Sequence, residues 1–162
     1  LTGTGSLSGY YSLRKIPEEL IGKTFHFIER NAGVDGTDTV GMIDFMAATP
    51  EAGISPKNAR LVQSYIICTP EEAKEKKILL HLRKILDKHL SYLIPDYENK
   101  LNWALYPAVW HLDGVAKTID NAKPAIDTPI KNLFVIGDGV KAPGIGFNCG
   151  LNSARKLNST FF

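Results

Sequence analysis

A continuous apolar run followed by glycine-rich sequence, near the C-terminus, constrains the fold more than any other feature of this chain. Residues 132–157 read NLFVIGDGVKAPGIGFNCGLNSARKL. The run from Leu133 to Ile136 has no polar interruption, which is typical of a strand buried on both faces of a parallel sheet. We therefore predict a strand over 132–138, a glycine-rich turn over 139–146, and a helix from about Gly146 to Asn158.

The predicted helix carries small residues along one face. Gly146, Gly150 and Ala154 are four residues apart, so they lie on the same side of the helix. A glycine inside a helix costs about 1 kcal/mol relative to alanine, so Gly150 needs a compensating reason. A bare face lets another backbone or a flat ligand approach closely. The N-terminus of a helix also favours an anionic ligand group, and ligands of open α/β sheets bind beyond the strand ends, where Gly137 and Asp138 lie.

This succession of strand, Gly137-Asp138, glycine-rich loop and small-residue helix resembles the C-terminal flavin motif of FAD-dependent oxidoreductases of the phytoene desaturase and amine oxidase group. The resemblance implies that Asp138 hydrogen-bonds the ribityl or diphosphate part of FAD. It also implies that the backbone around Gly146 approaches the pyrimidine edge of the isoalloxazine. The cofactor-binding residues implied in this way are Gly137, Asp138, Gly144, Ile145, Gly146, Phe147 and Asn148.

The resemblance implies an oxidoreductase that passes a hydride from a C–H or C–N bond to FAD. A helix N-terminus would stabilise negative charge on the reduced flavin. The Met, Phe and Ile residues of segment 39–48, together with the absence of an acidic cluster for an ammonium group, favour an apolar substrate over an amine. We predict no catalytic side chain and no metal site, because flavin hydride transfer depends mainly on positioning and exclusion of water.

The cradle for the ADP half of FAD is missing from the sequence. Gly3, Gly5 and Gly9 imitate a dinucleotide-binding turn, but their spacing is G-x-G-x-x-x-G and Pro17 interrupts the following helix. The chain also begins with Leu1 rather than methionine. We therefore expect the C-terminal part of a longer flavoprotein, whose N-terminal half is its partner and without which it binds FAD weakly or not at all.

The first three quarters of the chain predict an antiparallel sheet with one long helix. Alternating or apolar β-branched segments predict strands over 6–13, 24–29, 39–47, 59–69 and 100–106, the last with Leu101, Trp103 and Leu105 on one face. A capping box at Thr69-Pro70-Glu71-Glu72 and an apolar stripe at helical spacing predict a helix over 70–93, ended by Pro95.

The predicted fold class is accordingly α+β. Residues 1–131 form the substrate-binding portion, a mostly antiparallel sheet with the amphipathic helix. Residues 132–162 form the closing strand–loop–helix of an FAD-binding α/β domain.

Composition excludes some classes of function. A net charge of +2 is too small to indicate nucleic-acid binding, and no apolar run reaches the roughly 18 residues of a membrane span. Cys68 and Cys149 lack metal-ligand spacing, which predicts buried free thiols and favours a cytoplasmic location, with peripheral membrane association left open.

Several alternatives stay open. His81 and His89 are expected to be ordinary surface or boundary histidines, whereas His111 could border a substrate pocket. A non-catalytic relative of the same fold, similar to the Rab GDP-dissociation inhibitors that bind lipid-modified partners, is the main alternative to an enzyme. The other alternative is an unrelated α+β domain in which the motif of residues 132–157 occurs by coincidence.

Overall fold

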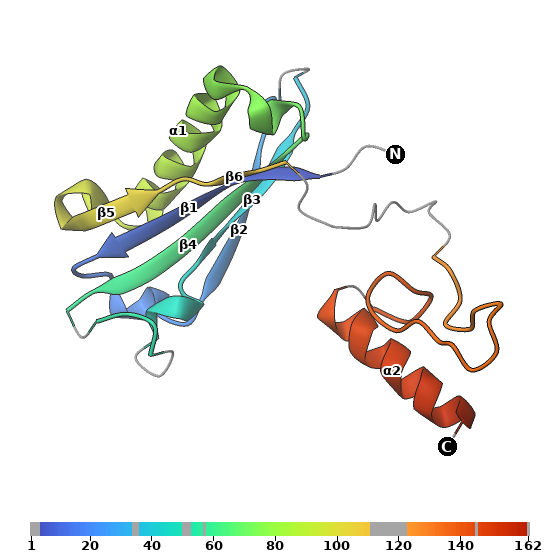
Figure 1. The fold of residues 1–162 in the computed structure, drawn as a ribbon. Helices are drawn as coiled ribbons and strands as arrows, with labels where there is room; N and C mark the ends of the chain where they lie inside the picture. Colours follow the sequence, from blue (N-terminus) through green and yellow to red (C-terminus); the bar gives the residue numbers. More distant parts are fainter. Residues whose placement is uncertain are drawn as a thin grey trace. The chain divides into compact units, whose positions relative to one another are not determined.

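The computed structural model describes residues 4–33, 36–49, 53–56, 58–110, 123–144 and 146–161. The chain forms two compact units, Leu1–Gly114 and Val115–Phe162 (Figure 1). The first unit contains the sheet and the helix α1, and the second contains the helix α2. The protein therefore has the α+β class and the mostly antiparallel sheet that the sequence predicts. The division between compact units lies earlier in the chain than the boundary at residue 131 that was predicted from function.

The sheet is antiparallel throughout and has the strand order β2-β3-β4-β1-β5, with β6 also paired to β1. All five strands predicted for the first three quarters of the chain are present. The strands are β1 (Gly5–Leu13), β2 (Thr24–Glu29), β3 (Thr39–Asp44), β4 (Arg60–Cys68), β5 (Leu101–Leu105) and the short β6 (Ala108–Val109). The third strand ends before the predicted residue 47, because the Asp44 carboxylate accepts a hydrogen bond from the Met46 N–H at 2.9 Å and starts a 3₁₀ turn, Met46–Ala48.

Helix α1 (Lys76–Leu93) covers one face of the sheet (Figure 1). Its predicted apolar stripe is confirmed, since Leu82, Ile85, Leu86 and Leu90 are buried. These side chains pack in clusters with sheet residues such as Leu7, Tyr11, Val62 and Ile66. Full burial of one such side chain contributes about 1.5–3 kcal/mol, so the helix–sheet interface is the main source of stability in this unit.

The start of α1 differs from the prediction. The capping box forms as expected, with the Thr69 N–H donating to Glu72 at 2.7 Å and the Glu72 N–H donating to Thr69 Oγ1 at 3.2 Å. It opens a 3₁₀ turn, Glu72–Lys74, rather than the long helix, and Glu75 is extended before α1 begins at Lys76. The buried side chain of Ala73 holds this turn against the core, so the predicted start at residue 70 is wrong.

The prediction that Leu101, Trp103 and Leu105 share one face is also wrong. A β-bulge interrupts the pairing of β1 with β5, so that Leu13 faces Leu101 while Ser12 faces Trp103. Leu101 therefore packs against the core, whereas Trp103 and Leu105 lie on the other side of the sheet and are more than half exposed.

The sheet face opposite α1, here called the open face, carries several exposed apolar side chains. The exposed large side chains of its strands include Ile28, Val40, Trp103 and Leu105. Among the described residues of the first unit, no helix packs over it (Figure 1). Gly5 and Gly9 pair with β4 instead of forming a phosphate-binding turn, as expected from their spacing, whereas Gly3 lies outside the described residues. A side chain at position 9 would not fit, because a Cβ there would lie 2.7 Å from the Tyr11 hydroxyl.

Candidate functional site

The second unit consists of helix α2 (Phe147–Phe161) and the loop that precedes it. The glycine-rich turn and the helix form where the sequence predicts them. The predicted strand over 132–138 does not form in the described residues, where Phe134 makes an isolated antiparallel bridge to Asp127. Leu133, Val135 and Ile136 are about half exposed, at 47%, 49% and 51%.

The predicted strand does not form because the described residues offer it no neighbouring strands. A strand inside a parallel sheet, as predicted for this run, has a hydrogen-bonding neighbour on each side. Within residues 123–144, the backbone of 132–141 meets one short segment, through Val135 N–H to the Ile126 carbonyl at 3.0 Å and Lys141 N–H to the Pro124 carbonyl at 2.8 Å.

Ser153 ties the Gly137-Asp138 turn to α2. Its buried hydroxyl accepts a hydrogen bond from the Gly137 N–H at 2.8 Å and donates to the Gly150 carbonyl at 2.6 Å. A Cβ built on Gly150 would lie 3.9 Å from the backbone nitrogen of Asp138. The bare face of α2 therefore lies beside the chain's own backbone at the end of the apolar run.

The thiol of Cys149 lies close to several main-chain carbonyls of the loop that precedes α2. The sulfur is fully buried and lies 3.5 Å from the carbonyl oxygens of both Val140 and Ala142, and 3.6 Å from that of Asp138. A thiol has one proton, so it donates to one of these acceptors at a time. Lys123 donates a hydrogen bond to the Asp138 carbonyl at 2.9 Å, and its Nζ lies 3.5 Å from the sulfur. This lysine therefore also holds the loop in place.

The cysteine predictions hold in part. Both thiols are free, and Cys149 is buried as predicted. Cys68 is only half-buried, and burial together with the nearby Glu72 carboxylate raises the pKa of its thiol to about 11.

A shallow cavity of about 370 Å³ lies over the first turns of α2. Its lining residues are Asp138, Gly146, Phe147, Gly150 and Leu151. Asp138, Gly146 and Phe147 belong to the set that the flavin resemblance implied. The spacing of small residues in the sequence indicates Gly150 but not Leu151. The only sequence signal for Leu151 is its position one helical turn after Phe147.

Gly137, Gly144 and Asn148 are not among the residues that line this cavity. Gly137 is held behind Asp138 by Ser153. Gly144 has a φ of +88°, and a Cβ there would lie 3.1 Å from Asn148 Cβ, so a glycine is required where the loop enters α2. Ile145 lies outside the described residues.

The residues of the cavity fit a planar heteroaromatic ligand. Gly146 and Gly150 leave one wall made of main chain, Asp138 supplies a carboxylate, and the apolar side chains of Phe147 and Leu151 are 82% and 51% exposed. The first N–H groups of a helix lack intrahelical partners and suit a ligand edge that carries carbonyls or negative charge. A volume of about 370 Å³ lies at the lower end of the range for ligand sites.

Other candidate residues do not form a site of this kind. His111 falls outside the described residues. His81 is exposed, and His89 lies 2.8 Å from Glu29 and stacks on Phe27 with ring centroids 3.9 Å apart. Within the described ranges, no three His, Cys, Asp or Glu side chains are grouped to hold a metal ion. The helices of those ranges are too short or too polar to cross a bilayer.

Comparisons with known proteins assign no family. No family model matches the chain, and no curated protein matches it. The likeness to a flavin motif therefore depends on residues 132–157 and on the geometry of the cavity at α2.

Proposed function

We propose that this chain is the C-terminal part of an FAD-dependent oxidoreductase of the phytoene desaturase and amine oxidase type, and that its second unit binds the flavin end of FAD. The cavity over the start of α2 carries this proposal, because Asp138, Gly146, Phe147 and Gly150 meet there. The N-terminal half of the longer protein would hold the ADP half of the cofactor. The chain alone would then bind FAD weakly or not at all.

Each residue of the cavity has a distinct role in this proposal. When bound, FAD supplies the chemistry of accepting a hydride from the substrate. Asp138 would accept hydrogen bonds from the ribityl chain, and the main-chain N–H groups from Gly146 to Asn148 would stabilise negative charge on the pyrimidine edge. Phe147 and Leu151 would exclude water from the ring. Gly150 would leave room for the ring to lie close to the helix.

The open face of the sheet supports an apolar substrate rather than an amine. Its exposed side chains include Ile28, Val40, Trp103 and Leu105. Among the described strand residues of this face, Asp44 is the one carboxylate, and it accepts hydrogen bonds from Thr24 and the Met46 N–H, both at 2.9 Å. An ammonium substrate would favour an uncommitted acidic group, so we propose a polyene-like or similarly apolar substrate on this face.

The same apolar face also suits a non-catalytic protein that binds a lipid-modified partner, similar to the Rab GDP-dissociation inhibitors. The cavity favours the enzyme, because a protein without a flavin has little need for a main-chain wall at the N-terminus of α2. The two functions differ in whether the intact protein retains FAD.

The visible absorption spectrum of the intact, purified protein tests the proposal. We expect a yellow protein with flavin absorption. Asp138→Ala should weaken flavin retention at least about tenfold, since a hydrogen bond to a charged group contributes about 1.5–3 kcal/mol. Asp127→Ala, which removes an exposed carboxylate outside the cavity, should retain flavin like the wild type.

Two results would contradict the proposal. A colourless protein that FAD cannot reconstitute favours the binding-protein alternative. Equal retention by Asp138→Ala and the wild type removes Asp138 from the site.

A further inference from the structure

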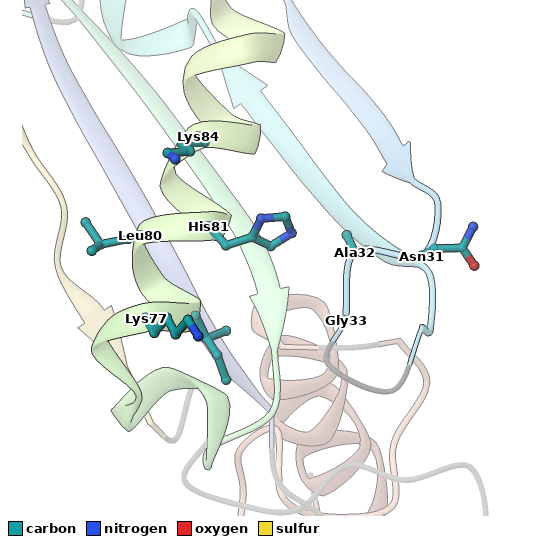
Figure 2. A pocket seen from close by; sticks show the side chains of 8 residues that line it. Asn31, Ala32, Gly33, Lys77, Leu80, His81 and Lys84 are labelled. Carbon is teal, nitrogen blue, oxygen red and sulfur yellow. The ribbon is translucent and has the colours of Figure 1, made fainter.

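A larger cavity, of about 580 Å³, lies in the first unit between the first half of α1 and the turn that follows β2 (Figure 2). Lys77, His81 and Lys84 line it from the helix, and Ala32 and Gly33 line it from the turn. Its volume is within the range of about 300–1,000 Å³ that small-molecule sites occupy. It shares no lining residue with the cavity at α2, so the inference below does not rest on flavin binding.

Three basic side chains lie on one side of α1 at this cavity. The spacings of four and three residues place Lys77, His81 and Lys84 on one face of the helix. Figure 2 shows the His81 ring directed from α1 toward Ala32, with Lys77 one turn before it and Lys84 one turn after it. The cavity therefore collects three donors at successive turns of one helix.

These three side chains make no hydrogen bond or ion pair with any of the described residues, unlike Arg83, Lys88 and His89 of the same helix. Lys88 lies 2.7 Å from the Glu29 carboxylate, and Arg83 lies 3.4 Å from that of Asp87. The N–H donors of these basic side chains are therefore available to a ligand in the cavity.

One acidic residue lies at helical spacing from this cluster. Asp87 follows Lys84 by three positions, but its carboxylate already accepts hydrogen bonds from Arg83, Tyr11 and Tyr106. Its carboxylate is therefore committed to groups other than the three basic side chains of the cavity.

Apolar groups complete the cavity between the charges. Ala32 is buried, Ile78 is half-buried, and Leu80 is half exposed at the rim. An inorganic anion would leave these groups without a partner. A ligand with an anionic head and an apolar body would contact both kinds of surface.

We infer that this cavity binds a phosphate monoester of an apolar alcohol, either as a free molecule or as a lipid headgroup. A phosphate group carries close to two negative charges and three acceptor oxygens, which matches a cavity lined by three basic side chains better than a carboxylate does. Its alkyl part would lie against Ala32 and Ile78.

Calorimetric titration of the intact protein with decyl phosphate tests this inference. Lys77→Gln and Lys84→Gln should each weaken binding about tenfold, as expected for loss of a charged hydrogen bond at a partly exposed site. Lys76→Gln is the matched control, since it changes an exposed lysine of the same helical turn that does not line the cavity. The control should alter affinity less than about twofold, a change expected of a solvent-exposed charge that does not contact the ligand.

Two further arms identify the source of the phosphate. Binding of decyl phosphate without binding to phosphatidic acid vesicles supports a free ester, and vesicle binding that requires phosphatidic acid supports a headgroup. The inference is overturned if neither probe binds, if Lys76→Gln weakens binding as much as the cavity variants, or if inorganic phosphate binds as tightly as decyl phosphate. Thermal melts of the variants confirm that each is folded.

Discussion

The two units differ in how they bury apolar side chains. In the first unit, α1 and the sheet enclose large side chains such as Tyr11, Leu86 and Ile94 completely. Among the described residues of the second unit, the buried hydrophobic side chains are Ile126, Val140 and Cys149, while the run 133–136 is about half exposed at three of its positions. The first unit thus owes its structure to hydrophobic burial. The second owes much of its structure to hydrogen bonds from Ser153, Lys123 and the main chain.

Polar groups show the same contrast. In the first unit Asp87 Oδ1 accepts hydrogen bonds from Tyr11 at 3.2 Å and Tyr106 at 2.7 Å, which joins α1 to the sheet. Burial, reinforced by the hydrogen bond to Asp87, raises the pKa of Tyr106 to about 12. The first unit encloses its polar groups, whereas the second presents Asp138 and a main-chain wall to a cavity. In the proposed function, the cofactor and the rest of the flavin domain complete the second unit.

The largest effect is expected from Leu86→Ala in the first unit. This side chain is fully buried beneath α1, and its truncation should lower the free energy of unfolding by about 3 kcal/mol, within the range of 2–5 kcal/mol for such changes. Urea denaturation followed by tryptophan fluorescence measures the loss. Leu80→Ala, at a side chain that is 50% exposed on the same helix, should cost less than about 1 kcal/mol. Equal losses would show that α1 does not cover the core through Leu86.

An intermediate effect is expected from Gly150→Ala in the second unit, which should raise stability and lower flavin affinity. The new methyl group meets no protein atom closer than 3.9 Å, so it should stabilise α2 by up to about 1 kcal/mol. The same methyl group would project beside the cavity and should weaken flavin binding. Thermal denaturation and flavin titration of the intact protein measure the two changes. Greater stability with unchanged flavin affinity would show that the bare face of α2 does not meet the flavin.

The smallest effect is expected from Glu29→Gln at the edge of the first unit. Hydrogen bonds from Lys88 and His89 lower the pKa of Glu29 below its usual value. A carboxyl whose pKa is lower in the folded state stabilises the fold above its unfolded pKa of about 4.3, and this stabilisation is lost as the pH falls through the folded pKa.

Wild-type stability should therefore decline below about pH 4 in part through Glu29. The Gln variant should be less stable at neutral pH by about 0.5–1 kcal/mol and should lack that part of the decline. Denaturation midpoints measured between neutral and acidic pH check this. The exposed Glu19→Gln is the control, and a matching change there would assign the effect to general charge.

Local patterns predicted much of the fold, and non-local pairing explains what they missed. The strands and the stripe Leu82, Ile85, Leu86 and Leu90 follow from periodicity that each segment carries by itself. The bulge opposite Ser12 depends on register with a distant strand, which no local pattern reports. The start of α1 was missed because a capping box opens a 3₁₀ turn as readily as a long helix.

The candidate site shows the same division. Glycine spacing and the Gly137-Asp138 step indicated the region of the cavity, whereas the contacts of Lys123, Cys149 and Ser153 arise from tertiary packing and left no signal in the sequence. The apolar run 133–136 reads identically whether or not neighbouring strands are present, so its composition predicted a buried strand that the described residues do not form.

Backbone amide hydrogen exchange at residues 146–150, measured in the intact protein with and without FAD, is the most direct test of flavin binding at α2. If the amides at the start of α2 meet the flavin, their exchange should slow markedly when FAD is bound, while amides late in α2 change little. Identical exchange at residues 146–150 in both states, in a protein shown to contain bound FAD, would mean that the flavin lies elsewhere.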